Sequence, residues 1–156
     1  MRIIRAKDYH EMSRRAAEII ASEVILKPDC VLGLATGSSP IGTYDELVKM
    51  YEDGALDFSG VRTVNLDEYC GLDITSDQSY VWFMHHHLFD RVNIRPENTY
   101  FPDGKQADAQ KACAEYDAVM EKTDGRICSC SGWDRTDISG STSRRTFSRP
   151  AHTRLR

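Results

Sequence analysis

A short run of apolar residues, at positions 30–35, most constrains how this chain can fold. The run reads Cys-Val-Leu-Gly-Leu-Ala and contains no charged side chain. A strand that is buried on both faces of a parallel sheet has such a continuous apolar sequence. Apolar residues at helical spacing follow it closely, over residues 41–51. The two segments therefore predict a strand–helix unit of an α/β fold.

The turn between these two segments has the composition of an anion-binding site. It consists of Thr36, Gly37, Ser38 and Ser39, and Pro40 follows. Ser39 is a favourable N-cap and Pro40 suits the first helical turn, so backbone N–H groups and the helix dipole would point at an anion. Phosphate is the natural ligand, and the hydroxyl groups would add donors. Serine and glycine are also common in ordinary strand–helix turns, so the turn alone leaves both interpretations open.

A second apolar, β-branched run, residues 61–66, predicts another short buried strand. It ends in two adjacent acids, Asp67 and Glu68. Open α/β sheets bind ligands outside the carboxyl ends of their strands, so these acids would lie where a ligand binds. The alternative is that Asp67 caps a turn and Glu68 is solvated.

The remaining segments continue the alternation of strands and helices. Asp8 and Glu11 resemble a capping box at the start of a first helix, and Ser76 or Asp77 is a candidate cap for a later one. The other predictions are a candidate strand at 2–6, a loop at 93–104 and a helix at 107–122. Together they predict a doubly wound, Rossmann-like parallel sheet with helices on both faces.

The composition is that of one ordinary globular domain. The chain has 156 residues, of which 40% are hydrophobic and 28% are charged. No apolar run approaches the length of a membrane span or a signal core, so we expect a cytoplasmic protein that binds no membrane. Five cysteines at irregular spacing do not predict a disulfide framework.

Neither of the two metal-like patterns predicts a metal site. Three consecutive helical histidines, residues 85–87, point about a third of a turn apart and cannot converge on one ion. Cys128 and Cys130 lack the second pair that a zinc site needs. We therefore expect no metal.

The charge is divided unevenly along the chain. Residues 126–156 hold seven arginines and two aspartates, a net charge of +5. Residues 1–125 hold 13 basic and 22 acidic residues, a net charge of −9. A basic arm that binds nucleic acid is one explanation. The arginines are scattered, with only two aromatic residues among them, so we expect no nucleic-acid binding.

Three segments together closely resemble glucosamine-6-phosphate deaminases. They are residues 32–40 (Leu-Gly-Leu-Ala-Thr-Gly-Ser-Ser-Pro), residues 64–72 (Val-Asn-Leu-Asp-Glu-Tyr-Cys-Gly-Leu) and residues 79–84, which begin with Ser-Tyr. The resemblance extends from the amino terminus to about residue 127. The related 6-phosphogluconolactonases share the architecture but usually not the middle segment.

The resemblance implies a phosphosugar substrate and a role in amino-sugar catabolism. The reaction converts glucosamine 6-phosphate and water to fructose 6-phosphate and ammonia, and it requires neither a metal nor an organic cofactor. Asp67 resembles the base that moves a proton between C2 and C1 of the sugar. Residues 36–39 resemble part of the phosphate cradle, and Glu68 is the further substrate-binding residue that we expect. Members of the family are often homo-oligomeric.

The resemblance stops after Ile127. The family continues with a segment that contains a ring-opening histidine and supporting acids, whereas residues 128–140 read Cys-Ser-Cys-Ser-Gly-Trp-Asp-Arg-Thr-Asp-Ile-Ser-Gly. Shifting the reading frame by two bases makes the codons of Trp133 and Asp134 encode glycine. The same shift makes those of Asp137 and Ile138 encode tyrosine or histidine. We hypothesise a frameshift near Ile127, in the gene or in its sequencing, which resequencing would test.

This hypothesis divides the chain in two. Residues 1–127 would be the amino-terminal part of a single α/β phosphosugar domain, and residues 128–156 an aberrant basic tail without order. A sheet truncated after its first strands would leave a strand edge and apolar helix faces uncovered. Two alternatives to an active deaminase stay open, a sugar-phosphate-binding fragment without catalysis and a 6-phosphogluconolactonase-like hydrolase.

Overall fold

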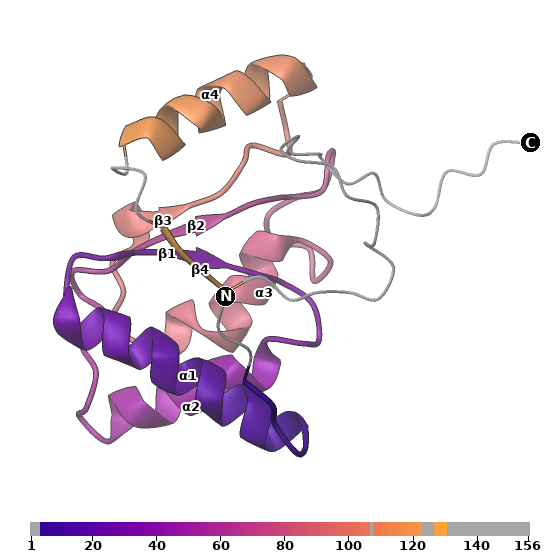
Figure 1. Ribbon diagram of the computed structural model, residues 1–156. Helices are drawn as coiled ribbons and strands as arrows, with labels where there is room; N and C mark the ends of the chain where they lie inside the picture. The colour runs from indigo at the N-terminus through magenta and orange to yellow at the C-terminus, as the bar shows by residue number, and fades with distance from the viewer. Residues whose placement is uncertain (1–3, 107, 123–126, 131–156) are drawn as a thin grey trace, which may run out of the picture.

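A parallel sheet with helices on both faces organises the molecule (Figure 1). The computed structural model describes residues 4–106, 108–122 and 127–130. In chain order, the helices and strands are α1 (Tyr9–Leu26), β1 (Val31–Leu34), α2 (Ile41–Glu52), β2 (Arg62–Asn65), α3 (Tyr80–His87), the 3-10 helices η1 (Phe89–Arg91) and η2 (Pro96–Asn98), β3 (Thr99–Tyr100), α4 (Ala109–Lys122) and β4 (Ile127–Cys130).

The four strands lie in the order β3-β2-β1-β4, and all neighbouring pairs are parallel. Figure 1 shows α1, α2 and α3 on one side of the sheet and α4 on the other. The order reverses direction at β1, because β2 and β3 lie on one side of it and β4 on the other. This arrangement confirms the doubly wound α/β fold.

The two faces of the sheet carry separate apolar clusters. The larger one joins β1 to α1, α2 and α3, and its members include Ala17, Leu32, Leu34, Tyr44, Leu47, Val48, Val61, Met84 and Leu88. The smaller one joins the opposite face to α4 through Val31, Val64, Tyr116 and Met120. In β1, residues 31 and 32 point to opposite faces, as the pleat of a strand requires. Because both sides are apolar, the continuous apolar run of this strand is explained.

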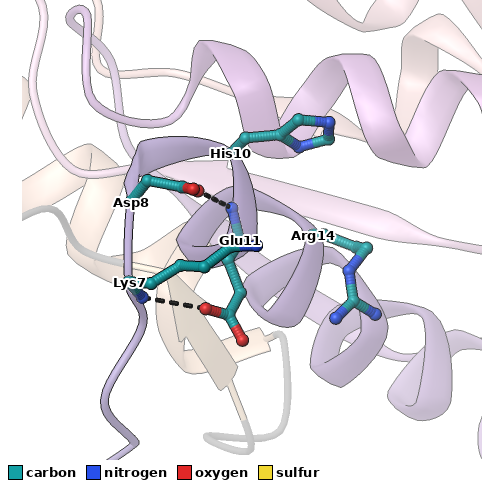
Figure 2. A pocket seen from close by; sticks show the side chains of 5 residues that line it. All are labelled: Lys7, Asp8, His10, Glu11 and Arg14. Carbon is teal, nitrogen blue, oxygen red and sulfur yellow. Dashed lines mark hydrogen bonds between the residues drawn. The ribbon is translucent and has the colours of Figure 1, made fainter.

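Helix α1 begins as the sequence predicted. The Asp8 side chain accepts a hydrogen bond from the backbone N–H of Glu11 at 2.8 Å, and the Glu11 carboxylate accepts from the N–H of Lys7 at 2.8 Å (Figure 2). In a regular capping box, the glutamate would reach the N–H of the cap residue itself. Here it reaches one residue further back. The two bonds satisfy two backbone donors at the start of the helix.

Helix α2 packs so closely on α1 that only glycine fits at position 42. A Cβ atom there would lie 2.5 Å from Ser13 Oγ and 2.9 Å from Tyr9 Cε1. The Tyr9 hydroxyl also accepts a hydrogen bond from the N–H of Gly42 at 2.9 Å. The expected side-chain cap from Ser39 is absent, since the cap position is Pro40 and no side chain bonds there. A tyrosine from the neighbouring helix binds one of the amides at this helix start.

Three local predictions differ from the structure. Helix α3 begins at Tyr80 with Ser79 as its cap, three residues after the candidate Ser76. The predicted loop at 93–104 contains the two-residue strand β3, which two prolines had obscured. Residues 4–6, part of the first candidate strand, have no regular structure.

Strand β4 includes three residues that the sequence analysis assigned to the basic tail. Residues 127–130 pair in parallel with β1, in register from Val31↔Ile127 to Leu34↔Cys130. A sheet ladder is made by backbone groups, so it can form with many side chains. The lack of order that was predicted for residues 131–156, and the prediction that their arginines have no role, concern residues outside the described ones.

Candidate functional site at the carboxyl edge of the sheet

The turn after β1 lies at the carboxyl edge of the sheet and is fixed from α2. The Tyr44 hydroxyl donates a hydrogen bond to the Ala35 carbonyl, which holds the end of the strand against the helix. Gly37 has φ of +97°, a left-handed conformation that favours glycine. Thr36 is half-buried, whereas Gly37, Ser38 and Ser39 are exposed. The predicted phosphate cradle is therefore an ordered turn that is open to solvent.

Part of this turn is already bonded to α1. The Tyr9 hydroxyl lies 3.1 Å from both the Ser38 and Ser39 carbonyl oxygens and can donate to them. These contacts use carbonyl groups and leave the hydroxyls of both serines without a bond to this tyrosine. The turn is thus held through carbonyl acceptors, which a phosphate could not use.

Asp67 follows β2 at the same edge of the sheet. Leu34 and Asn65, the last residues of β1 and β2, are partners in the sheet register. The two strands therefore end side by side, and the turn after β1 and the segment with Asp67 both begin there. Asp67 is half-buried. Burial, and then the negative charge of Glu68, raise the pKa of the Asp67 carboxyl above its ordinary value. A carboxylate in such a place holds a proton more readily than an exposed one, which suits a general base.

Glu68 is buried and points into the start of α3, with only 4% of its surface exposed. One carboxylate oxygen accepts from the backbone N–H of Tyr69 at 2.8 Å and of Tyr80 at 3.0 Å. The other accepts from the Ser79 hydroxyl at 2.9 Å and the N–H of Val81 at 3.0 Å. The interpretation of a solvated Glu68 is therefore wrong. Its contacts fix the loop after β2 to the start of α3.

Tyr80 joins the residues of this site, although no sequence pattern predicted a role for it. Its ring packs on Tyr69, with centroids 4.7 Å apart and ring planes tilted by 41°. The pKa of Tyr80 is raised by burial, by hydrogen bonding to Tyr69 and by the charge of Asp67, while a hydrogen bond with Thr36 lowers it. These interactions bring together side chains from the turn after β1, the end of β2 and the start of α3.

A second loop supports the segment that carries Asp67. The N–H of Gly71 donates to the Gly104 carbonyl at 2.8 Å. Lys105 pairs with Asp73 at 3.0 Å, and both side chains are exposed. A Cβ atom at Gly104 would lie 2.3 Å from the Tyr69 carbonyl oxygen, so this position accepts only glycine. The loop after β2 is thus held by Glu68 and, at Gly71 and Asp73, by the loop that precedes α4.

The histidines on α3 have different main partners, and His86 and His87 also contact each other, with ring centroids 5.1 Å apart. His86 stacks on Trp82 at 4.7 Å, His87 packs against Phe83 at 4.4 Å, and His85 lies 2.7 Å from the Asp90 carboxylate. Within the part of the chain that the structure describes, no group of three histidine, cysteine or acidic residues could hold a metal ion.

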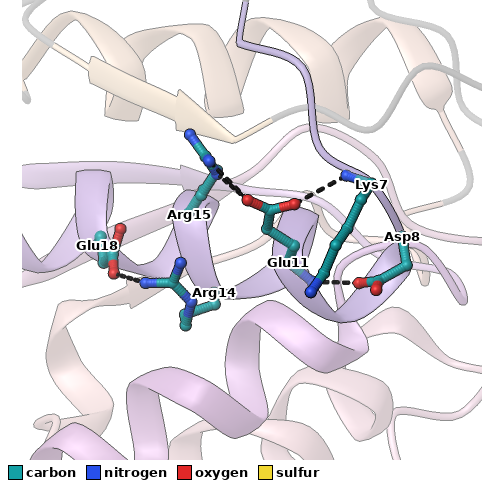
Figure 3. Close-up of polar contacts among 6 residues, drawn as sticks. All are labelled: Lys7, Asp8, Glu11, Arg14, Arg15 and Glu18. Atoms are coloured by element: carbon teal, nitrogen blue, oxygen red, sulfur yellow. Dashed lines mark hydrogen bonds and ion pairs between the residues drawn. The ribbon is translucent and has the colours of Figure 1, made fainter.

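A surface hollow lies at the start of α1, lined by Lys7, Asp8, His10, Glu11 and Arg14 (Figure 2). None of the predicted site residues lines it. Its charged groups are paired along the helix: Glu11 with Arg15, and Arg14 with Glu18 (Figure 3). These i,i+4 pairs are exposed or half-buried and contribute little to stability. The hollow has no feature that indicates a ligand.

A family model decides the relationship of this chain to known proteins. The model for glucosamine-6-phosphate isomerases and 6-phosphogluconolactonase matches residues 6–138. The chain belongs to this family.

Curated relatives within the family are named glucosamine-6-phosphate deaminase. The chain is 51% identical over 125 residues to the deaminase of Clostridioides difficile, which covers 80% of this chain and 50% of that protein. It is 50% identical to the deaminase of Lachnoclostridium phytofermentans, again covering 80% of this chain and 53% of that protein. The chain therefore spans about half the length of the curated relatives it matches.

Solved structures of the family share the fold. A structure described as a monomeric glucosamine-6-phosphate deaminase superposes with a TM-score of 0.76 at 36% identity, covering 78% of this chain and 51% of that one. A 6-phosphogluconolactonase from Thermotoga maritima gives a TM-score of 0.61 at 19% identity, covering 75% and 52%. The second likeness shows the fold alone. The family and fold that the three sequence segments implied are confirmed, whereas the roles of individual residues stay predictions.

Proposed function

We propose that this chain carries the proton-transfer and phosphate-binding part of a glucosamine-6-phosphate deaminase, in amino-sugar catabolism. The reaction takes glucosamine 6-phosphate and water to fructose 6-phosphate and ammonia. The observation that carries the proposal is the position of Asp67, which is half-buried at the carboxyl end of β2 and level with the turn after β1. Deaminases among the relatives support this substrate.

Asp67 acts as the base of the isomerisation. Its carboxylate removes the proton from C2 of the open-chain sugar, which gives an enolamine, and returns it to C1. The product is an imine at C2, and water adds there while the nitrogen leaves as ammonia. One carboxylate serves both proton transfers because C1 and C2 are adjacent, so the group need not move far. The raised pKa of Asp67 favours its holding the proton between the two steps.

The turn of Thr36, Gly37, Ser38 and Ser39 binds the phosphate. The exposed turn precedes α2, whose N-terminal dipole favours an anion. Glu68 was predicted to contact the substrate. Because both of its oxygens accept bonds from protein donors, our proposal gives it a positioning role, in which it fixes the loop that carries Asp67.

The proposal needs no metal, organic cofactor or nucleic acid, and a phosphosugar is the one ligand that it names. We place the activity in the cytoplasm, where phosphosugar metabolism occurs. None of the helices within the described residues combines the length and apolar composition that crossing a bilayer requires. Homo-oligomers are common in the family, and sedimentation of the purified chain would measure its own state.

A second candidate is a sugar-phosphate-binding fragment without catalysis. It is favoured by the sequence after β4, where residues 131–140 contain no histidine, whereas the family resemblance implies a ring-opening histidine there. A lactonase is a weaker alternative. Curated relatives named deaminase have 51% and 50% sequence identity to this chain, whereas the lactonase structure has 19%.

Two measurements on the 156-residue chain separate these functions. Calorimetry with glucosamine 6-phosphate measures binding, and an enzyme-coupled assay measures ammonia release. An active deaminase would lose ammonia release in Asp67→Asn but keep binding, while Asp29→Asn, an exposed control, would change neither. Binding without ammonia release would support the second candidate. Hydrolysis of 6-phosphogluconolactone would support a lactonase, and a chain that binds no phosphosugar would refute the proposal.

A further inference from the structure

Tyr69 and Tyr80 form a pair whose position the fold determines. One oxygen of the buried Glu68 carboxylate accepts hydrogen bonds from the backbone N–H of Tyr69 at 2.8 Å and of Tyr80 at 3.0 Å. The two rings pack on each other, with centroids 4.7 Å apart. Tyr80 is the first residue of α3 and is half-buried. Because one carboxylate binds both backbones, the Tyr80 ring is held in place without a ligand.

The Tyr80 hydroxyl belongs to a row of three hydroxyl groups that begins in the predicted phosphate cradle. Burial raises the pKa of Tyr80, and the hydrogen bond with Tyr69 and the charge of Asp67 raise it further. The hydrogen bond with Thr36 lowers this pKa. A bond that a phenol donates is lost when it ionises, whereas a bond that it accepts becomes stronger. The Thr36 hydroxyl therefore donates to Tyr80, and Tyr80 donates to Tyr69.

A phosphate in the turn would change the partners of this row. The raised pKa keeps Tyr80 a neutral hydroxyl at pH 7, which can donate one hydrogen bond and accept others. Hydrogen bonds to a charged acceptor are stronger than those to a neutral one, so the Thr36 hydroxyl would turn to the phosphate. The Tyr80 oxygen would then lose its donor and would accept a hydrogen bond from the ligand.

The proposed substrate carries hydroxyl groups at that place. Its phosphate is on C6, and C2 is the carbon from which Asp67 would take a proton. Strands β1 and β2 end side by side, and neighbouring strands are about 4.8 Å apart. With the phosphate in the turn and C2 at Asp67, carbons C3, C4 and C5 lie between them. Tyr80 is bonded to Thr36 and senses the charge of Asp67, so it is close to both ends of this span.

We propose that Tyr80 binds the carbon chain of the phosphosugar and makes the site selective for phosphate esters that carry hydroxyl groups between C2 and the phosphate. In the complex, the Tyr80 oxygen accepts a hydrogen bond from one of the hydroxyl groups on C3, C4 and C5, in place of the bond from Thr36. Its own proton stays on the bond to Tyr69. The inference rests on the proposed function, and it gives Tyr80 no part in phosphate binding or in proton transfer at carbon.

Three ligands separate this role from phosphate binding. Calorimetry on the 156-residue chain compares glucosamine 6-phosphate, hexyl phosphate and inorganic phosphate. Hexyl phosphate has the same phosphate and a chain of the same length, but no hydroxyl groups. Tyr80→Phe keeps the ring and removes only the hydroxyl. We expect this variant to bind glucosamine 6-phosphate about fivefold more weakly, the effect of one neutral hydrogen bond, and to bind the other two ligands within about twofold of the parent chain.

Two further variants give contrasting patterns. Thr36→Val removes a donor to the phosphate, so it should weaken the binding of all three ligands by a similar factor. Tyr51→Phe is the matched control, since Tyr51 is half-buried in the last turn of α2, at the opposite end from the turn after β1. It should change the binding of none of them. Circular dichroism checks that each variant is folded, which we expect for Tyr80→Phe because the backbone bond from residue 80 to Glu68 remains.

Three results would overturn the inference and leave the deaminase proposal standing. The first is equal binding of glucosamine 6-phosphate by Tyr80→Phe and the parent chain. The second is an equal loss of affinity for inorganic phosphate in Tyr80→Phe, because Tyr80 would then act on the turn. The third needs no variant and is equal affinity of the parent chain for glucosamine 6-phosphate and hexyl phosphate. A parent chain that does not bind glucosamine 6-phosphate would refute the inference together with the proposed function.

Discussion

Removing the Glu68 carboxylate tests how the candidate site is held together. This side chain accepts bonds from three backbone N–H groups and one hydroxyl, at 2.8–3.0 Å, and is 4% exposed. A hydrogen bond to a charged group contributes about 1.5–3 kcal/mol, and an unsatisfied buried donor costs about 1–3 kcal/mol. The bonds share one acceptor group and are not additive, so we expect Glu68→Ala to destabilise the fold by about 3–5 kcal/mol.

The isosteric change should cost less. In Glu68→Gln the amide oxygen can keep the bonds to Tyr69 and Tyr80, while the amide nitrogen donates to the Ser79 hydroxyl. The N–H of Val81 keeps a bond to the same hydroxyl, which lies 3.1 Å away. One charge-assisted acceptor is then lost, so we expect Glu68→Gln to lower the free energy of unfolding by about 2 kcal/mol. In a domain of this size, each kcal/mol lowers the melting temperature by about 2–4 °C.

Urea titration followed by circular dichroism gives these free energies. Hydrogen–deuterium exchange adds a local measurement, since the amides of Tyr80 and Val81 should lose protection in Glu68→Ala before those of β1. Glu52 is exposed and serves as the control, with an expected change within about 0.5 kcal/mol for Glu52→Ala. If Glu68→Ala were no more destabilising than Glu52→Ala, the proposed role of Glu68 in fixing the loop after β2 to α3 would be refuted.

Three further changes test the other parts of the structure. Asp67→Asn should raise the melting temperature at pH 7, because burial and a neighbouring carboxylate disfavour the charged form of Asp67. The gain should vanish below pH 3.9, the ordinary pKa of an aspartate, and a gain that persisted there would contradict this cause. Gly42→Ala should cost about 1–3 kcal/mol through its contacts with Ser13 and Tyr9, and Ser13→Gly should recover the part of that loss that comes from Ser13 in a double-mutant cycle; additive effects would exclude the Ser13 contact. Tyr116→Phe should cost about 1–2 kcal/mol by chemical denaturation, since its hydroxyl lies 2.6 Å from the Asn65 carbonyl oxygen, and an unchanged midpoint would refute that.

The sequence was most informative where local patterns decide the structure. The apolar run at 30–35 became β1, and the periodic segments became α1, α2 and α4 with ends within a few residues of the prediction. Strand β3 was missed because two residues between prolines carry no periodic signal. Its position depends on pairing with β2, which is a contact between distant segments.

The start of α3 could not be predicted for a related reason. Local rules favoured Ser76 or Asp77 as the cap, but the helix begins after Ser79. The carboxylate of Glu68, eleven residues earlier, accepts from Ser79 and from the N–H groups of the first turn. Ser79 also caps the helix locally, because its hydroxyl accepts from the N–H of Val81. The support that Glu68 adds from a distance leaves no mark on the residues around the helix start. Tyr80 was missed as a site residue in the same way, because its contacts with Tyr69 and Thr36 arise only in the fold.

The two adjacent acids, Asp67 and Glu68, have different roles, because the fold gives them different surroundings. Glu68 has its oxygens occupied by protein donors, so it is committed to holding the loop. Asp67, one residue earlier, is half-buried, and the charge of Glu68 helps to raise its pKa. The same carboxylate therefore fixes the position of Asp67 and strengthens it as a base. Exchanging the two residues, as Asp67→Glu with Glu68→Asp, should shorten the side chain at position 68 by one methylene. The carboxylate at position 68 would then neither fix the position of residue 67 nor strengthen it as a base.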